Sequence, residues 1–328
     1  RIDFTDNTDG HLLLEPQRTN YVDYGNDASQ WTDVVSNGTV TKTANYAVSP
    51  DGTQNATRLE ASVSGSGFAL ILLATTTSFE GDYVSTVYVK SNTGSNQDIV
   101  FYGRNTDVEV HIVTGEWTRI QFKGSSSSGL SNYAYVGIST GKSEEDNPID
   151  ILVWGGQLEQ GTHPTSYIPT NGSTVTRATE TCNNAGNSTL INSTEGVLYF
   201  EGSSLIELGG VNRHITISNG SDSNRLYFYH DTNGRFGFAS FVNGVLQANI
   251  TYDGIIAENS KVACKYKEND YAMWIDGVER GTDTSASVWS SGTLDALNFA
   301  NPSASNNYFY GKCKALTVFN TALTDAEL

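Results

Sequence analysis

The chain has 328 residues, of which 36 are Asp or Glu and 19 are Lys or Arg, and its formal net charge is −17. This acidic excess argues against nucleic acid and anionic membranes as partners, because binding phosphates requires clustered Lys and Arg. No apolar run approaches the roughly 20 residues that a membrane-spanning helix needs, so we expect no membrane insertion. The length predicts two domains.

The first 20 residues predict a polar N-terminal arm with one short apolar run. From Tyr21 onward, segments of about four to eight residues alternate between apolar and polar or run apolar, as β-strands do. Clusters of Gly, Ser, Asn and Pro separate them and predict turns. Residues 21–170 therefore predict an antiparallel β-sandwich of the jelly-roll type. The predicted strands lie within residues 39–48, 55–63, 67–76, 83–91, 97–104, 108–124, 132–139 and 150–159.

The segment from Trp154 to Glu180 closes this domain. It contains Pro164 and Pro169 and continues into Asn171-Gly172-Ser173, which predicts a linker over residues 171–180. The prolines and an aromatic side chain between them predict a strap that packs along a domain instead of a flexible tether.

Residues 181–328 repeat the pattern of short strands with different sequences. Asn243-Gly244 and Asp276-Gly277 predict tight hairpins, because a type I′ turn needs positive φ at both central residues. The tail TALTDAEL predicts one short helix with Thr324 as its cap. The predicted fold class is all-β: two tandem antiparallel β-sandwiches followed by a short C-terminal helix. The predicted strands lie within residues 196–204, 205–210, 213–219, 224–231, 234–242, 245–252, 261–269, 271–281, 295–301 and 312–320.

Several segments of the first half carry a family resemblance. SPDGTQNATRLEAS, YVSTVYVKSNTG, VTGEWTRIQFKG and IDILVWGGQLEQG, together with Trp31, resemble the jelly rolls of carbohydrate-binding modules of the family 4, 9 and 22 group. The flanking segments LLLEPQRTNYV and PTSYIPTNGSTVTRATE resemble a pattern found in phage tail, spike and head-fibre proteins. This resemblance implies a virion appendage and says little about a ligand.

The second half resembles the concanavalin A-like, laminin G-type sandwich. MWIDGVERG and the ending YGKCKALTVFNTALTDAEL carry the resemblance. The superfamily includes lectins, adhesion modules, glycoside hydrolases and polysaccharide lyases, so the fold alone does not decide the function.

The motifs expected of an enzyme are incomplete. Retaining glycosidases need two carboxylates about 5 Å apart, and on this sandwich they usually come from an E-x-D-x-x-E run, which this sequence lacks. Glu144-Glu145-Asp146 lies in a polar turn. Arg213-His214 with two nearby tyrosines is a loose version of a lyase motif, but no Gln-x-His is present. We therefore assign no catalytic residue.

The aromatic content points to sugar binding. Flat aromatic faces bind the C–H surfaces of sugars, and polar side chains orient the hydroxyls. Tyr133 and Tyr135 are two apart and share a strand face, as do Tyr227 and Tyr229, whereas Trp289 stands among small polar residues. Tyr83 and Tyr88 are further aromatic candidates, and core packing stays open for every one of them. The predicted ligand-binding residues are Trp31, Tyr102, Arg104, Tyr133, Tyr135, Tyr227, Tyr229 and Trp289.

No cofactor is required by any motif. A structural calcium ion remains open, because Asp3, Asp6 and Asp9 have ligand-like spacing, although an acidic flexible arm is the preferred interpretation of these residues. Cys264 and Cys313 could be free thiols or one disulfide.

The leading hypothesis is a non-catalytic glycan-binding and adhesion region of a phage or prophage virion appendage. Its partner would be a host-surface or environmental polysaccharide, its location the virion outside the cell, and its assembly a homotrimer. One alternative is a polysaccharide hydrolase or lyase that uses the second sandwich. Another is a structural virion module without a ligand.

Overall fold

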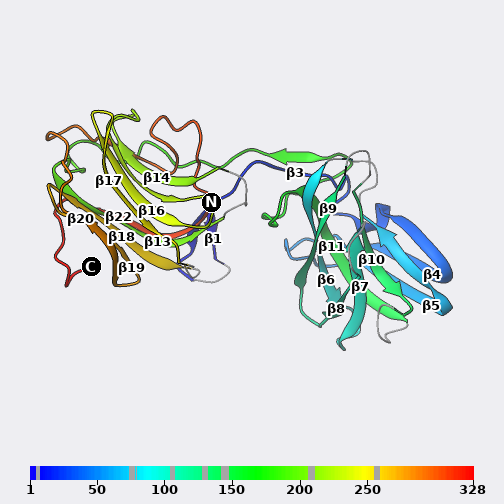
Figure 1. The fold of residues 1–328 in the computed structure, drawn as a ribbon. Coiled ribbons are helices and arrows are strands. Elements are labelled where there is room, and N and C mark those ends of the chain that lie inside the picture. The colour runs from blue at the N-terminus through cyan, green and yellow to red at the C-terminus, as the bar shows by residue number, and fades with distance from the viewer. Residues whose placement is uncertain are drawn as a thin grey trace. The chain divides into compact units, whose positions relative to one another are not determined.

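The computed structural model describes residues 1–4, 8–73, 78, 80–103, 108–127, 132–141, 148–205, 211–254 and 259–328. The protein is all-β, as predicted, and its strands form antiparallel sheets (Figure 1). Within the described ranges no helix is long and apolar enough to cross a membrane. The chain divides into two compact units. We call Gln17–Ala178 the central unit, and Arg1–Pro16 with Thr179–Leu328 the terminal unit.

The central unit is a sandwich built around one long strand. Its sheet has the order β8-β7-β10-β5-β11-β6-β9, with β4 on the free side of β5. The first part of β5 pairs with β11 and its last part pairs with β10, so the sheet folds over at β5 and its two halves enclose one core. The strands are β4 (Thr32–Ala47), β5 (Ala56–Leu72), β6 (Gly81–Ser91), β7 (Gln97–Gly103), β8 (Glu109–Val113), β9 (Thr118–Ser126), β10 (Ala134–Ser139) and β11 (Ile149–Gln160).

The predicted strap packs along the central unit. Thr165 donates hydrogen bonds from its backbone N and its hydroxyl to the carboxylate of Glu159, at 2.7 and 2.6 Å. The backbone N of Ile168 donates to Gln157 Oε1 at 2.7 Å. The strap is therefore held by buried hydrogen bonds, and this prediction is confirmed.

The linker predicted over residues 171–180 differs from the structure. Gly172 donates its backbone N–H to Asp23 O at 2.8 Å, and β12 (Val175–Arg177) pairs with β3 (Arg18–Asn20). These residues thus belong to the central unit, and its boundary lies after Ala178.

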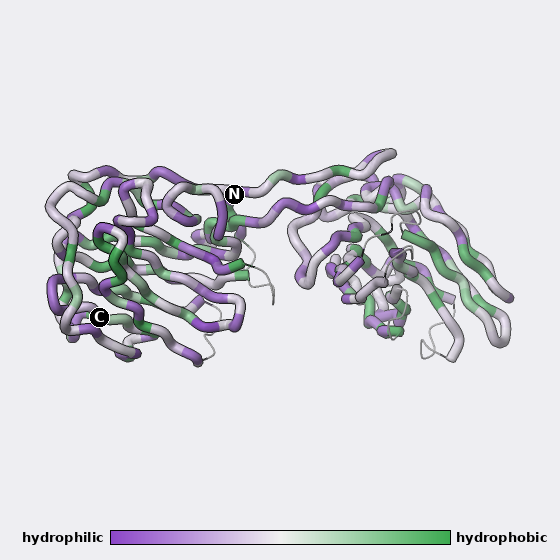
Figure 2. The backbone as a smooth tube through the Cα atoms, turned by 45° about the horizontal axis from the view of Figure 1, so that its top comes forward, coloured by the Kyte–Doolittle hydropathy of each residue, from purple (hydrophilic) through white to green (hydrophobic). Residues whose placement is uncertain are grey.

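The terminal unit contains two sheets with one core between them. One has the order β1-β2-β22-β13-β18-β19-β20 and the other the order β17-β16-β15-β14-β21. Alternate residues of both sheets point inward, among them Phe200 and Met273 from the first and Phe228 and Phe238 from the second. In Figure 2 the hydrophobic stretches follow the strands and the polar ones gather at many turns. The strands are β1 (Ile2–Asp3), β2 (His11–Leu14), β13 (Glu195–Ser204), β14 (Arg213–Ser218), β15 (Arg225–His230), β16 (Phe236–Val242), β17 (Val245–Tyr252), β18 (Ser260–Lys267), β19 (Tyr271–Ile275), β20 (Val278–Asp283), β21 (Ala296–Asn298) and β22 (Gly311–Phe319).

The N-terminal residues are not a free arm, contrary to the prediction. Within β2, Leu12 pairs with Cys313 of β22, and Leu14 is only 2% exposed. The apolar run is buried because it extends the sheet, and this pairing joins residues about 300 positions apart, which no local pattern reveals.

The predicted turns form, but the predicted C-terminal helix does not. Asn243 and Gly244 have φ of 49° and 83°, and Asp276 and Gly277 have φ of 52° and 74°, as type I′ turns require. The tail makes a single turn in which Thr324 donates its backbone N and hydroxyl to the Glu327 carboxylate. This is the start of a capping box without a helix after it. The three cysteines are free thiols.

Candidate functional site

Two of the predicted site residues, both tryptophans, are structural. Trp31 is 5% exposed and donates its Nε1–H to Tyr24 O at 2.9 Å. Trp289 is 2% exposed, donates to Phe241 O at 2.9 Å, and meets the Tyr266 ring edge-on. Both indole N–H groups have backbone partners, so the prediction that these side chains are ligand-binding surfaces is wrong. Polar neighbours in the sequence of Trp289 do not expose it, because the loop folds its one large apolar side chain into the core.

Three predicted tyrosines of the central unit lie together. Tyr102 and Tyr135 are directly opposite on β7 and β10, with ring centroids 5.3 Å apart, and Tyr133 lies 4.9 Å from Tyr135. All three are half-buried. We call them the tyrosine ridge. Arg104 lies outside the described residues. Burial raises the pKa of Tyr102, and the neighbouring Tyr135 raises it further.

The remaining predicted pair, Tyr227 and Tyr229, lies on the outer side of the five-stranded sheet. Phe228 between them points into the core, so both tyrosines point away from it. The register of β14 and β15 puts His214 opposite Tyr229. We call the aromatic face the set that shares this side of the sheet: His214, Arg225, Tyr227, Tyr229, Phe241 and Asn249.

A glycine fixes the position of Tyr229. Gly237 is its partner on β16, and a Cβ at Gly237 would lie 2.1 Å from Cζ of the Tyr229 ring. The ring therefore lies across β16, and its hydroxyl meets Asn249 Oδ1 on β17 at 3.1 Å. No side chain lies beneath the ring, so the ring lies flat on β16, and only 9% of the Tyr229 surface is exposed.

The Arg225 side chain contacts the rings at the other end of the aromatic face. The Arg225 guanidinium lies 4.9 Å from the centroid of the Tyr227 ring and 4.7 Å from that of Phe241. These two rings are nearly parallel, with an interplanar angle of 13°. Arg225 also forms an ion pair with Asp222. The contact of a guanidinium with two rings holds Tyr227 in place.

His214 is the most unusual group of the aromatic face. It is 6% exposed, and neither ring nitrogen has a hydrogen-bond partner among the described residues. Its ring stacks on Tyr227, with centroids 4.7 Å apart. Burial, together with the smaller effect of the Arg225 charge, lowers the pKa of His214 to about 4. The imidazole is therefore neutral at pH 7 and carries one N–H donor and one acceptor, both unused. Buried polar atoms without partners are rare.

The structure does not assemble the loose lyase motif. Arg213 and His214 are adjacent on a strand and point to opposite sides. Arg213 donates its Nε–H to Leu205 O at 3.0 Å and lies over the Tyr310 ring. Its guanidinium is thus held away from the aromatic face.

The acidic residues near the sheets are also engaged. Asp231 accepts hydrogen bonds from the Arg235 backbone and side chain, and Glu201 pairs with Lys314. Glu207 and residues 144–146 lie outside the described ranges. The sequence prediction of no catalytic residue stays a prediction.

No metal site emerges from the part of the chain that the structure describes, where no three His, Cys, Asp or Glu side chains gather. Asp3 pairs with Lys312 at 2.9 Å, and Asp6 lies outside the described residues.

A second aromatic group in the central unit was only partly foreseen. Tyr88 of β6, Trp154 of β11 and Tyr167 of the strap have ring centroids 4.7 to 6.5 Å apart. Arg119 lies over Tyr88 and donates to Thr165 O. This group packs the strap onto the sheet. The sequence predicts the packed strap from its prolines and its aromatic residue, but it does not show which rings the strap meets. Tyr83, the other candidate, is fully buried.

Comparison with known proteins bears mainly on the terminal unit. Residues 206–328 match a family model described as the concanavalin A-like lectin/glucanases superfamily. No curated protein sequence matches the chain.

Three solved structures illustrate the structural similarity. The CBM40 of Ruminococcus gnavus IT-sialidase is 15% identical, with a TM-score of 0.37, and the match covers 45% of this chain and 94% of that chain. Domains LG4-5 of the mouse laminin alpha1 chain are 8% identical, with a TM-score of 0.27 and coverage of 78% and 90%. The CBM22-1-CBM22-2 tandem of Paenibacillus barcinonensis Xyn10C is 12% identical, with a TM-score of 0.31 and coverage of 93% and 98%. At these values we draw no conclusion about a ligand from them.

Proposed function

We propose that this chain is a non-catalytic glycan-binding protein and that the aromatic face holds a sugar ring. The observation that carries the proposal is His214: a buried, neutral imidazole with two unused hydrogen-bonding atoms, stacked beside two tyrosines on the same side of the sheet. A sugar supplies what this surface lacks, because it combines an apolar C–H face with hydroxyls that both donate and accept.

The expected mode of binding follows from the geometry. The C–H face of a pyranose stacks on Tyr227 and Tyr229, whose centroids are 5.5 Å apart. The His214 nitrogens are buried beside Tyr227, so a sugar hydroxyl donates to or accepts from one of them after the Tyr227 ring moves aside. The exposed amide of Asn249 stands at the far end of Tyr229 and offers further donors.

The tyrosine ridge of the central unit supports a second, weaker contact. It is partly exposed and has the same chemistry, a row of tyrosine rings. Two weak sites on one chain increase the residence time on a repetitive polysaccharide without a new contact.

The biological setting we propose is a phage or prophage virion appendage outside the cell, presented as a homotrimer. Its support is the resemblance of residues 12–22 and 164–180 to phage appendage proteins. The first segment contains β3 and the second contains β12, and the chain enters and leaves the central unit through this pair of strands.

A polysaccharide-degrading enzyme is the alternative function that a specific observation supports. The family model that matches residues 206–328 includes glucanases, so a polysaccharide hydrolase or lyase in the terminal unit is the second candidate. A virion module without a ligand is the third.

A glycan array probed with the full chain, combined with an assay for reducing ends and unsaturated products, tests the proposal. We expect binding without product. Tyr227→Leu should reduce binding at least about fivefold, because the loss of one stacking ring removes roughly 1 kcal/mol or more. The matched control is Tyr46→Leu, which changes an exposed tyrosine of the other unit. Product formation would support the enzyme instead. If Tyr227→Leu binds glycan as well as the parent chain does, the binding site does not include the aromatic face.

A further inference from the structure

The aromatic face continues into an apolar surface on β17. Leu246 of β17 lies opposite Phe241 of β16, and directly opposite residues of a sheet point to the same side. A β-bulge creates this pairing, because the register shifts after Ser240 and skips Gln247. Leu246 therefore lies on the same side of the sheet as the aromatic face.

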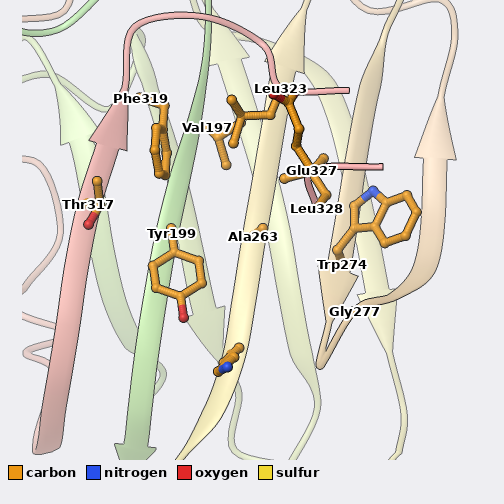
Figure 3. A pocket seen from close by; sticks show the side chains of 11 residues that line it. Val197, Tyr199, Ala263, Trp274, Gly277, Thr317, Phe319, Leu323, Glu327 and Leu328 are labelled. Atoms are coloured by element: carbon orange, nitrogen blue, oxygen red, sulfur yellow. The ribbon is translucent and has the colours of Figure 1, made fainter. Parts of the chain in front are cut away.

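Leu246 is open to solvent. Its side chain is 50% exposed, and it is not one of the described side chains that pack against the core of the terminal unit. The outer side of the seven-stranded sheet differs, because the tail lies over it. There Val197 and Phe319 line a cavity of about 230 Å³ together with Leu323 and Leu328 of the tail (Figure 3). Leu246 has no comparable cover within the described ranges, so its apolar surface is accessible to a ligand.

The side chains between Leu246 and the tyrosines also present hydrocarbon. The Phe241 ring is half-buried, and its centroid lies 6.5 Å from that of Tyr227. The Arg225 guanidinium lies against both rings, and its charge is balanced by Asp222. We call Tyr227, Phe241 and Leu246 the apolar end of the aromatic face.

The polar groups near the apolar end are either distant or engaged. Asn249 stands at the far end of Tyr229, whose hydroxyl it meets at 3.1 Å. Gln247 is the neighbour of Leu246 in the sequence, and its Oε1 accepts a hydrogen bond from Ser287 N at 3.1 Å. The Gln247 Nε2 donates to a backbone carbonyl at 3.4 Å. A polar substituent placed on the apolar end would therefore lose water without gaining a partner.

This distribution of groups discriminates between classes of sugar. An ordinary hexose would place its C6 hydroxyl on the apolar end, an N-acetylated sugar an amide, and an acidic sugar a carboxylate. Each of these groups would lie unpaired against Phe241 and Leu246. A 6-deoxy hexose places a methyl group there instead, and the methyl group buries apolar area on both side chains.

We propose that the aromatic face is specific for a 6-deoxy hexose. The sugar ring lies on the tyrosines, and its C5 methyl group packs against Phe241 and Leu246. This inference rests on the proposed glycan binding and names the class of sugar that the aromatic face takes.

The test is a calorimetric titration of the full chain with matched sugars that differ only at C6. The pairs are L-fucose and L-galactose, L-rhamnose and L-mannose, and D-quinovose and D-glucose. We expect at least one 6-deoxy sugar to bind at least about fivefold more tightly than its parent hexose, because a methyl group replaces an unpaired hydroxyl. N-acetylglucosamine and glucuronate should bind no more tightly than D-glucose.

Variants locate the methyl group. Leu246→Asn changes an exposed side chain and should remove the preference for the 6-deoxy sugar, because an amide can pair with the C6 hydroxyl of the parent hexose. Val245→Asn is the matched control. Val245 is 60% exposed and pairs with Val242, which packs against the core, so it points to the other side of the sheet and its substitution should keep the preference.

The proposal is overturned if no 6-deoxy sugar binds more tightly than its parent, including the case in which none of the six sugars binds. It is also overturned if N-acetylglucosamine or glucuronate binds as tightly as the best 6-deoxy sugar, or if Leu246→Asn keeps the preference. Glycan binding on the array and its loss in Tyr227→Leu do not depend on the C6 substituent, so the proposed function and this inference fail separately.

Discussion

His214 shows how one residue connects stability to the proposed site. Its ring is neutral because burial disfavours the imidazolium, so folding holds the pKa of His214 at about 4, below its ordinary value of 6.5. Between pH 4 and pH 6.5, His214 is therefore protonated in the unfolded chain and neutral in the folded chain. Stability is full above about pH 6.5 and falls as the pH drops toward 4. Burial likewise lowers the pKa of His230 to about 4, and it adds a loss of the same sign.

The first prediction is a pH dependence of unfolding. Between pH 7 and pH 5, His214 should remove about 2 kcal/mol from the unfolding free energy of the terminal unit. Urea titrations of the chain and of His214→Phe at both values measure it. The variant keeps a ring on Tyr227 and should lose about 2 kcal/mol less than the parent over this interval. Equal losses in both chains would contradict the buried, neutral imidazole.

The second prediction concerns Gly237, which touches no ligand. Gly237→Ala puts a Cβ into the Tyr229 ring, so Tyr229 must move off β16. We expect a loss of about 1–3 kcal/mol in stability and a loss of glycan binding of tenfold or more. Gly115→Ala, where the nearest atom would lie 3.7 Å away, is the control for both readouts. Unchanged binding in Gly237→Ala would separate Tyr229 from the site.

At this scale the sequence predicts residue types better than their roles. The spacing of Tyr227 and Tyr229 predicted a shared face correctly, because strand alternation is local. Trp31 and Trp289 were misjudged, because whether an indole N–H meets water or a backbone carbonyl depends on chain segments that a local pattern does not contain. The unused nitrogens of His214 gave no sequence signal at all.

At the scale of strands and helices, too, the sequence predicts local features better than long-range ones. The two type I′ turns and the predicted strands depend on a few neighbouring residues, and they formed, except that the strand predicted over residues 205–210 lies almost wholly outside the described residues. The β2–β22 pair and the strap depend on contacts between distant residues. The predicted C-terminal helix did not form for a different reason. The contacts between Thr324 and Glu327 close a single turn, and one hydrogen-bonded turn is unfavourable by itself because it fixes several dihedral angles for one hydrogen bond.

A third prediction tests β2 as a part of the terminal unit. Leu14→Ala should cost about 2–4 kcal/mol of unfolding free energy, because Leu14 is packed in that core. Ile2→Ala, at a side chain that is 52% exposed, should cost much less. Denaturant titration measures both. If residues 1–20 formed the separate arm that the sequence predicts, Leu14→Ala would be neutral.

A fourth prediction tests the strap. Thr165→Val removes the hydroxyl that donates to Glu159, a carboxylate that is fully buried. We expect a loss of about 1–3 kcal/mol in the central unit. Thr176→Val, which breaks an exposed hydroxyl pair between β12 and β3, is the matched control and should change little. A loss of the same size in both variants would mean that the strap is not held by Glu159.

For the whole molecule, the sequence predicts two sandwiches but not how the chain is shared between them. The terminal unit uses both ends of the chain, and the central unit is inserted between residues 16 and 179. Composition and turn spacing do not reveal such an insertion, because the sequence pattern of a strand does not show which strand it pairs with. The chain enters and leaves the central unit through paired strands, so the two crossings lie side by side.

The central claim is that a neutral His214 on an aromatic face binds a sugar. The most direct measurement is the ¹⁵N spectrum of the histidine rings of the full chain at pH 7, with and without a glycan that the array has identified. The account predicts that the His214 ring nitrogens shift on binding, stay neutral, and that the glycan is recovered intact. A glycan that binds while the His214 signals remain unchanged, or one that is cleaved, would contradict it.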